Sequence, residues 1–352
     1  SMVIKMIIGY LILVLYFTAD AVAAEVYERK GYTRFKGALW GLIPIYGVIH
    51  VFKARDIKLY QKTALSKFYT PKELLMKLLT FAELVLVAVI VVVPVIYMIG
   101  SSFAAQTGLP TTFWPETLTL NNYVKLFNET KFPVWFKNTL IIAILNTIIG
   151  VVFITGAAYV FSRFKFKGKK VGLITILVLQ VFPGFMGLIA MFTLFEVFGL
   201  LGKPVALTIL YVGGAVPFNL WLIKGYLQQI PKDLDESAML DGANKMQIFF
   251  KIILPLSVPI LSFVAVSMFM APWMDYMLPK FLLDVNVSGG AENIKEQWTL
   301  AVGLFEMIAG ADKQSYTTFA AGSMIIATPI TILYMVFQRF LIQGITAGAT
   351  KG

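Results

Sequence analysis

A single polar stretch reads Glu236-Ser237-Ala238-Met239-Leu240-Asp241-Gly242, and Ile252, Leu254 and Pro255 follow it, between long apolar runs. Charged helix formers are costly inside a lipid bilayer, so we expect this stretch to lie in water and to meet a partner there. The apolar runs on either side of it set the class of fold.

The composition indicates a membrane protein with several spans. Of the 352 residues, 58% are hydrophobic and only 14% are charged, whereas soluble domains contain about 45–50% apolar residues. A bilayer core of about 30 Å needs about 20 apolar residues per helix. The windows that approach or exceed this length are 78–100, 138–162, 171–197, 204–223, 253–272 and 317–340. We therefore expect an all-α membrane protein with six core transmembrane helices.

The basic residues predict the orientation of these helices. Lys and Arg number 30 against 19 Asp and Glu, and basic residues concentrate in two short stretches, 53–77 and 163–170. Short basic loops mark the cytoplasmic side of a membrane protein. Alternation then places 224–252 in the cytoplasm and both 101–137 and 273–316 outside. The net charge of +11 thus reflects topology rather than binding to nucleic acid.

The first 70 residues are expected to form an amino-terminal extension. Residues 3–24 are long enough to span the membrane, and residues 38–52 form a shorter run that fits an interfacial or re-entrant segment. Lys5, the apolar run and Ala21-Val22-Ala23 also fit a cleavable signal peptide. We favour an extra anchoring helix within 1–70, ahead of the main membrane domain over 72–352.

The polar stretch itself predicts two short helices separated by a bend. Pro231 is tolerated only in a first helical turn, and Asp233, Asp235 and Glu236 favour the positive end of a helix. Gly242 permits a break two to three turns later. An amphipathic connector lying on the membrane is the alternative reading of the same pattern.

The spacing of this segment resembles a known family signature. Permease subunits of ATP-binding-cassette importers carry an E-A-A, G, I-x-L-P signature. This segment resembles it at Glu236-Ser237-Ala238, Gly242 and Ile252-x-Leu254-Pro255, with Ser237 in place of the second alanine. In that family the loop, here residues 231–252, is a coupling helix that enters a cleft of the ATPase. The resemblance implies these ATPase-coupling residues: Glu236, Ser237, Ala238, Asp241, Gly242, Ile252, Leu254 and Pro255.

The end of the chain resembles the second permease subunit of maltose/maltodextrin importers. The similarity is carried by Trp298-Thr299-Leu300-Ala301-Val302-Gly303, by Pro329-Ile330-Thr331 and by 338–352, and it extends over about 72–352. It implies a sugar importer in a bacterial or archaeal cell membrane. The implied partners are a homologous second permease, two copies of a cytoplasmic ATPase and an extracytoplasmic sugar-binding protein.

The sequence also indicates that ATP is hydrolysed elsewhere. No phosphate-binding G-x-x-x-x-G-K-[ST] motif occurs, since Gly168-Lys169 and Gly202-Lys203 lack the rest of it. We therefore expect no cofactor in this chain, with ATP and Mg bound by the partner ATPase. There is no cysteine and His50 is the one histidine, so neither a metal site nor a catalytic base is expected.

Other transport classes remain as alternatives. An importer for another oligosaccharide or for a glycerol-phosphate-like solute fits the same family signature. A self-sufficient carrier or channel is disfavoured, because the spans contain few ionisable residues, with Glu83 and Glu196 near span ends. A membrane-embedded enzyme is disfavoured because no convergent catalytic set is visible.

Three further groups of site residues are expected. Polar residues beside helix breaks fit a translocation path, although they also fit packing between helices: Gln180 and Asn219. The tip of the long outer loop fits a contact with the binding protein, although a solvated loop is the alternative: Asn286, Gly289, Gly290 and Asn293. The resemblance implies that the tail contacts the ATPase, although a frayed terminus is the alternative: Gly344, Thr346, Gly348 and Lys351.

Overall fold

A computed structural model describes residues 71–106, 108–110, 112–180, 184–286, 291–309 and 315–349. The chain divides into two compact units, one up to Met98 and one from Ile99 onward. Apart from an isolated bridge between Ala104 and Leu118, the regular structure of the described residues is helical. The all-α fold class is thus confirmed, whereas the expected extension 1–70 lies outside the described residues.

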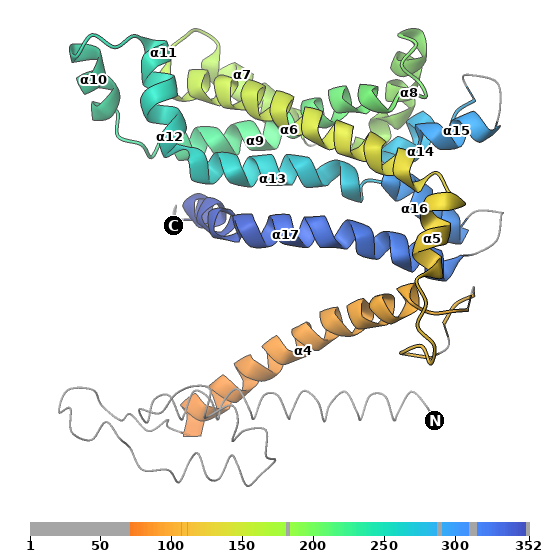
Figure 1. Ribbon diagram of the computed structural model, residues 1–352. Helices are drawn as coiled ribbons and strands as arrows, with labels where there is room; N and C mark the ends of the chain where they lie inside the picture. The colour runs from red at the N-terminus through yellow and green to blue at the C-terminus, as the bar shows by residue number, and fades with distance from the viewer. Residues whose placement is uncertain are drawn as a thin grey trace. The chain divides into compact units, whose positions relative to one another are not determined.

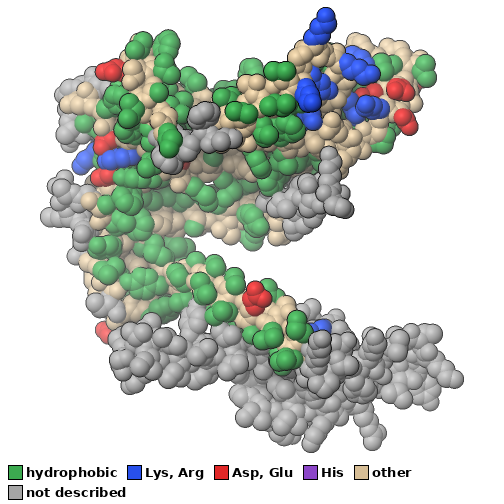
Figure 2. All heavy atoms as spheres, turned by 180° about the vertical axis from the view of Figure 1, so that it is seen from behind, with side chains coloured by type: hydrophobic (Ala, Val, Ile, Leu, Met, Phe, Trp, Pro, Cys, Tyr) green, Lys and Arg blue, Asp and Glu red, His purple; other side chains and the backbone are tan. Residues whose placement is uncertain are grey.

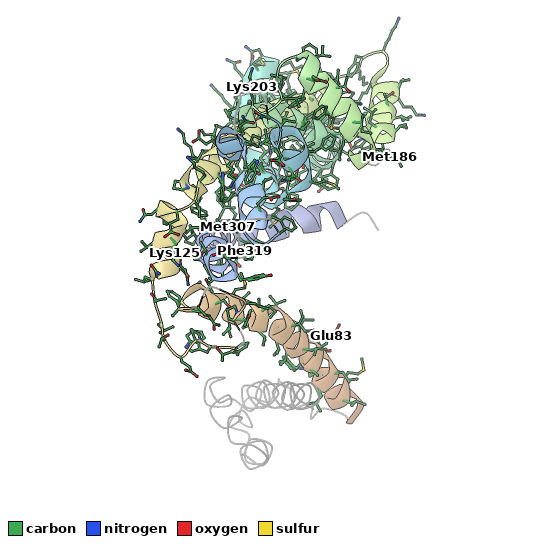
Figure 3. The ribbon with its side chains drawn as sticks, turned by 90° about the vertical axis from the view of Figure 1, so that its right-hand side faces the viewer. Glu83, Lys125, Met186, Lys203, Met307 and Phe319 are labelled. Atoms are coloured by element: carbon green, nitrogen blue, oxygen red, sulfur yellow. The ribbon has the colours of Figure 1, made fainter. Side chains whose placement is uncertain are left out.

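Helix α4, Pro71–Ser102, supplies the described part of the first unit and continues into the second. From Leu75 to Ser102 it is long and apolar enough to cross a membrane. Side chains such as Val87 and Val91 are more than half exposed, as expected for a helix that faces lipid. Glu83 projects from the side of this helix (Figure 3).

Long helices in the second unit pack side by side (Figure 1). Helix α6 packs against α9 and α13, and α13 packs in turn against α17. The long helices and the segments that join them are α5 Asn121–Asn128, α6 Phe132–Arg163, α7 Lys169–Leu179, η2 Gly184–Gly187, α8 Leu188–Val197, η3 Pro204–Ala206, α9 Leu207–Leu227, α10 Asp233–Leu240, α11 Lys245–Ile248, η4 Phe249–Ile253, α12 Leu254–Leu256, α13 Val258–Met274, α14 Met277–Leu283, α15 Ala291–Gln297, α16 Leu300–Ala309 and α17 Tyr316–Ala349.

Five of the expected membrane windows correspond to membrane-length helical segments. Within the described residues, four helices are long and apolar enough to span, and a bent pair, Lys245–Leu256 with Val258–Met274, makes a fifth candidate. The window 171–197 is not one continuous helix: α7 ends at Leu179, and η2 and α8 follow. Pro183 lacks the N–H that a continuing helix needs, and Gly184 adds backbone freedom, which accounts for the division.

Buried apolar clusters connect the helices at both ends of the second unit. One cluster includes Ile154, Ile223, Ile248 and Ile260 and joins α6, α9, α11 and α13. Between the ends, the Asn146 side-chain amide donates a 2.6 Å hydrogen bond to the Met268 carbonyl and joins α6 to α13. This agrees with the packing role expected of polar groups between membrane helices.

The cluster at the other end joins α6, α16 and α17. It includes Trp135, Trp298 and Leu304, and Met307 of α16 and Phe319 of α17 pack against it (Figure 3). Charged side chains gather at the two ends of the second unit, with hydrophobic side chains between them (Figure 2). This distribution is the one expected of a helix bundle whose two ends lie in water and whose middle faces lipid.

Candidate functional site

The coupling loop, residues 231–252, forms a pair of short helices at one end of the second unit (Figure 1). Helix α10 has three acidic residues in its first turn, Asp233, Asp235 and Glu236, where the helix dipole favours negative charge. Glu236, Ser237 and Asp241 are exposed, and Ala238 is half-buried. The residues that carry the family signature therefore face solvent along this helix and are available to a partner.

Helix α10 ends in a Schellman motif at Gly242. The Ala243 N–H donates to the Ala238 carbonyl at 2.9 Å, and the Gly242 N–H donates to the Met239 carbonyl at 3.1 Å. Gly242 has a φ of 85°, in the left-handed region that glycine adopts without steric cost. The glycine of the signature is therefore needed for the chain to turn out of α10, as its position in the sequence predicts.

The chain re-enters a helix through a capping box. The Asn244 side chain accepts from the Gln247 N–H at 2.9 Å, and the Gln247 side chain accepts from the Asn244 N–H at 2.8 Å. These reciprocal bonds satisfy amide donors that a helix start leaves without partners. Helices α10 and α11 are thus both defined by hydrogen bonds between near neighbours in sequence, and together with the turn at Gly242 they form one compact unit.

An ion pair fastens this unit to the membrane helices. Arg163 ends α6, and its Nε lies 3.0 Å from Oδ2 of Asp235, with only 5% and 11% of the two side chains exposed. The Arg163 guanidinium also donates to the Ile230 carbonyl at 3.0 Å. The sequence analysis expected Asp235 only as one of the acidic residues that stabilise the positive end of the helix. Its partner was missed because the two residues are far apart in sequence.

Tyrosine hydroxyls add two further links, one to the loop and one to the segment just after it. Tyr159, one turn before Arg163, donates to the Lys245 carbonyl at 3.1 Å, and its ring packs 4.7 Å from that of Phe249. Tyr226 of α9 donates to the Leu256 carbonyl at 3.1 Å. The loop is therefore held by α6, and α9 holds the α12 segment that follows it.

The second half of the signature lies at a sharp bend. Ile252 is in the π-helical segment η4, and Leu254 and Pro255 form α12. The axis turns by 77° between Lys245–Leu256 and Val258–Met274. A π-helical turn and a proline are recognised causes of such bends. Ile252 packs against the buried cluster beneath the loop, so the bend is anchored in the bundle.

The expected outer loop is fastened to the start of α6. The Asn138 side chain donates to the carbonyls of Glu296 and Trp298 at 2.9 and 3.0 Å, and the Leu300 N–H donates to the Thr139 hydroxyl at 2.8 Å. Trp135 donates to the Lys295 carbonyl at 2.6 Å. The stretch from Trp298, which carries part of the family resemblance, is thus bonded to the start of α6.

A charged network continues this outer region. Lys280 of α14 contacts Asp284 at 2.6 Å and Glu306 at 2.7 Å, and its ammonium group lies 5.3 Å from the Trp298 ring centroid. The Trp298 indole donates to Asp284 at 3.0 Å. The sequence analysis did not find this network, because acidic residues in a long loop such as 273–316 are expected to face solvent rather than to bond one another's partners.

The remaining candidate residues lie apart from these two regions or outside the described residues. Asn286 is exposed, Gly289 and Gly290 lie outside the described residues, and α15 begins at Ala291 before Asn293. Gln180 is exposed at the end of α7. Asn219 is buried and donates to the Ala215 carbonyl of its own helix at 3.0 Å.

The tail forms the last turns of α17. Its backbone is helical as far as Ala349, and Lys351 lies outside the described residues. The described tail residues are Gly344, Thr346 and Gly348.

Comparison with known proteins identifies the family. The profile of the binding-protein-dependent transport system inner membrane component family matches residues 150–347. The maltodextrin transport system permease protein MdxG of Bacillus subtilis (strain 168) is 37% identical over 282 residues, 79% of this chain and 98% of its own. The galactooligosaccharides transport system permease protein GanQ of the same organism is 38% identical over 279 residues, 78% of this chain and 95% of its own.

A further relative and a solved structure agree with this assignment. The trehalose/maltose transport system permease protein MalG of Thermococcus litoralis is 34% identical over 284 residues, 80% of this chain and 99% of its own. A bacterial ABC transporter involved in the import of the acidic polysaccharide alginate contains a chain that superposes with a TM-score of 0.66. It is 22% identical and covers 77% of this chain and 98% of that chain, which supports the fold. The chain belongs to the family of inner membrane components of binding-protein-dependent transport systems, as a multi-pass permease related to those of sugar ABC importers.

Proposed function

We propose that this chain is the permease subunit of an ATP-driven importer of maltodextrins. The observation that carries the proposal is the exposed signature on α10, which Arg163 fastens to the cytoplasmic end of α6, while Tyr159 fastens the start of α11 to the same helix. A load applied to α10 from the cytoplasm reaches α6 through these contacts and reaches α13 through the bend at Ser257. The loop thus has the geometry of a lever between a soluble motor and a membrane bundle.

The motor in this proposal is a separate ATPase subunit. The chain has no phosphate-binding loop of its own, so ATP and Mg bind to the partner. Two copies of that ATPase carry this permease and a homologous second one, and closure of the pair tilts the helices between inward-open and outward-open states. Ser237, Asp241 and Glu236 form the exposed polar contact surface in this assignment.

The outer region receives the sugar-binding protein. The 295–300 segment is bonded to Asn138 and Thr139, so a binding protein that docks there rests on a surface fixed to α6. A solved alginate transporter contains a periplasmic protein bound to an alginate pentasaccharide. We extend this partner class to the present chain, with Asn286 to Asn293 as the contacting tip and Gln180 and Asn219 beside the sugar's path.

The tail is a second proposed contact with the ATPase. Helix α17 continues through Gly344, Thr346 and Gly348, beyond the Tyr316–Gln338 part that is suited to span the membrane. A helix of this length carries the chain end past the bilayer toward the motor. Deleting 345–352 should lower transport per ATP hydrolysed, whereas unchanged transport and ATPase rates would assign the tail to a frayed end.

The test of the main proposal uses the complex reconstituted with its binding protein. Sugar-loaded binding protein should stimulate ATP hydrolysis in the wild-type complex, and Glu236→Lys should remove most of that stimulation by reversing the charge that faces the motor. Glu129→Lys, an equal charge change just after α5 on the outer side, is the control and should retain coupling. Normal stimulation and uptake by Glu236→Lys would refute the lever.

A second substrate class is supported by sequence similarity. GanQ, named for galactooligosaccharides, is as similar to this chain as the maltodextrin permease MdxG. Stimulation of ATP hydrolysis by binding proteins loaded with maltodextrin or with galactooligosaccharide distinguishes the two substrates. The maltodextrin assignment requires the larger response with maltodextrin, and the reverse order would assign the chain to galactooligosaccharide import.

A further inference from the structure

The coupling loop presents a large apolar side chain to water. Leu240, the last residue of α10, is 90% exposed, more than any other large apolar side chain in the described part of the chain. The side chains that come nearest to this exposure, such as Ile189 at 75% and Val197 at 74%, lie on α8, an apolar helix that lipid covers. The charge pattern places 224–252 in the cytoplasm, so the exposure of Leu240 calls for a different contact.

Leu240 lies on the face of α10 that is turned away from the bundle. Asp235 is buried in its ion pair with Arg163, and Ala238 packs against the buried cluster beneath the loop, so these two residues mark the inward face. Glu236 and Leu240 lie one helical turn apart on the other face, and both are exposed. The apolar side chain therefore shares its outward surface with the glutamate of the family signature.

The backbone around Leu240 is held on both sides by hydrogen bonds. The Gly242 N–H donates to the Met239 carbonyl, and the Ala243 N–H donates to the Ala238 carbonyl. Leu240 lies between the donors and the acceptors of both bonds, so its main chain is fixed by the turn. A side chain that is already held in one position loses little conformational entropy when it binds. The turn at the end of α10 therefore presents the leucine as a preorganised contact.

The exposed charges that accompany Leu240 on this helix and at its carboxyl end are acidic: Asp233, Glu236 and Asp241. Basic residues lie before the helix, at Lys232, and after it, at Lys245, but none occurs within α10. An apolar centre with a polar rim is the usual arrangement of a contact between proteins. The surface that complements α10 is therefore an apolar pocket whose rim is basic.

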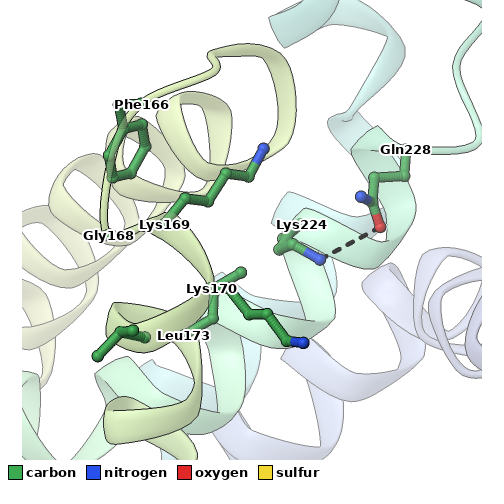
Figure 4. A pocket seen from close by; sticks show the side chains of 8 residues that line it. Phe166, Gly168, Lys169, Lys170, Leu173, Lys224 and Gln228 are labelled. Carbon is green, nitrogen blue, oxygen red and sulfur yellow. Dashed lines mark hydrogen bonds between the residues drawn. The ribbon is translucent and has the colours of Figure 1, made fainter.

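A lipid surface fits this pattern poorly. Helices that lie on a membrane carry basic residues on their polar face, and the cytoplasmic leaflet is anionic, so it repels the acidic residues of α10. The basic side chains at this end of the bundle gather elsewhere, where Lys169, Lys170 and Lys224 line a cavity of about 450 Å³ between α7 and α9 (Figure 4). The charges of α10 therefore favour a soluble protein as its occupant.

We propose that Leu240 is the apolar anchor by which α10 docks on the ATPase, where it inserts into an apolar pocket with a basic rim. The inference rests on the proposed function, in which a separate ATPase is the motor. It assigns most of the binding free energy of this contact to the leucine, because burial of a fully exposed leucine side chain is strongly favourable. The acidic residues around it set the rate of encounter and the orientation of the two proteins.

Binding of the purified ATPase subunit to the permease complex in nanodiscs tests the anchor. The complex contains this chain and its homologous second permease, and biolayer interferometry measures the association and dissociation rates. Leu240→Ala should weaken binding about fiftyfold, mostly through faster dissociation, because it removes three carbons and each buried methylene contributes a factor of about four. Leu240→Met, which conserves the volume, should stay within about tenfold of the wild type.

Matched variants separate the anchor from its surroundings. Met246→Ala removes a 63% exposed apolar side chain from α11 and should bind as the wild type does. Leu240 is exposed and alanine is the better helix former, so Leu240→Ala leaves the fold intact. Equal binding by Leu240→Ala and the wild type, or an equal loss in Met246→Ala, would overturn the anchor.

A charge variant tests the rim of the pocket. Asp233→Asn with Asp241→Asn should slow association at low ionic strength, and the difference from the wild type should disappear at high salt, because salt screens the attraction between the rims. Faster association by this variant would show an acidic rim on the ATPase and would overturn the proposed pocket.

A chemical probe identifies what covers position 240. The chain has no cysteine, so the mass of the Leu240→Cys chain reports its reaction with a water-soluble maleimide at this one position. The thiol should react in nanodiscs without the ATPase and should be protected when the ATPase is bound. Protection by lipid alone would assign the side chain to the membrane, and reaction in both states would leave it outside the contact. Either result overturns the proposal.

These measurements separate the anchor from the proposed function. They need no sugar and no ATP hydrolysis, so they do not depend on which solute is imported. A wild-type complex that binds no ATPase would refute both the proposed function and the anchor. A wild-type complex that binds the ATPase, together with equal binding by Leu240→Ala, would refute the anchor alone and would leave the test of the lever with Glu236→Lys unaffected.

Discussion

Arg163 and Asp235 form a buried ion pair that joins the end of α6 to the first turn of α10, with 3.0 Å between Nε and Oδ2. The exposed signature of the coupling loop is therefore attached to the bundle by a residue next to Glu236 in sequence. Asp235 points inward and Glu236 points outward, so adjacent acidic residues have different roles.

The first prediction concerns this ion pair. Asp235→Ala leaves the Arg163 charge buried without its partner, which should lower the free energy of unfolding by about 3–5 kcal/mol. Arg163→Met combined with Asp235→Leu should lose less than the sum of the two single changes, because no lone charge remains. Denaturant unfolding of the purified complex measures both. Asp233→Ala, on the exposed start of the same helix, is the control, and an equal loss in that variant would contradict the prediction.

The second prediction concerns Gly242. A β-carbon added there meets no atom within 4 Å, so substitution acts through the positive φ of 85° rather than through crowding. Gly242→Val should lower the free energy of unfolding by about 1–2 kcal/mol and weaken sugar-stimulated ATP hydrolysis. Gly242→Asn should retain most of that hydrolysis, since asparagine tolerates the left-handed region. Equal activity in the valine and asparagine variants would show that the turn does not matter.

The third prediction compares two glycines in the bundle. A β-carbon at Gly303 would overlap the rigid indole of Trp135, whereas one at Gly150 would overlap the flexible end of Met268. Gly303→Ala should therefore destabilise the protein by about 1–3 kcal/mol, and Gly150→Ala by less, because a methionine end can move. Thermal unfolding in the same detergent gives the comparison. A larger loss in Gly150→Ala would contradict it.

The fourth prediction concerns the pH dependence of the outer network. Burial lowers the pKa of Lys280, but hydrogen bonds and charges from Asp284 and Glu306 outweigh it and raise the pKa above its ordinary value of 10.5. Since the folded pKa exceeds the unfolded one, the charged lysine stabilises the fold below about pH 10.5, and the contribution is lost as pH rises through the folded pKa.

Lys280→Met should accordingly be less stable than the wild type by a constant amount between about pH 7 and 9. The difference should narrow above about pH 10.5, as the pH rises from the unfolded pKa of the lysine through its higher folded pKa. Thermal unfolding as a function of pH measures this. Lys203→Met, an exposed lysine (Figure 3), should show no such narrowing, and a constant difference for Lys280→Met up to high pH would contradict the assignment.

Local features of the coupling loop could be predicted from the sequence. The acidic start of α10, the break at Gly242 and the second helix all follow from caps, dipoles and backbone freedom, which act over a few residues. Apolar length alone predicts the four long membrane helices and the bent pair. These features need no knowledge of tertiary contacts.

Contacts between distant residues could not be predicted in this way. Two such contacts are the ion pair between Asp235 and Arg163 and the hydrogen bond from Trp135 to the Lys295 carbonyl. They depend on how the helices pack, and that packing leaves no periodic signal in the sequence. Continuous apolar composition indicated one span over 171–197, with a helix break expected beside Gln180, whereas the structure divides the window into α7, η2 and α8. Hydropathy measures whether a segment is apolar, but Pro183 decides whether it continues as one helix.

Three links at the coupling loop and its two flanks have main-chain carbonyls as acceptors: that of Ile230 just before the loop, that of Lys245 within it and that of Leu256 just after it. A carbonyl is present whatever side chain its residue carries. The exposed side chains of the loop are therefore free to vary without loss of these attachments. Replacing the outward-facing residues of α10 and α11 with those of another permease, while Asp235 and Gly242 are kept, should redirect this bundle to a different ATPase.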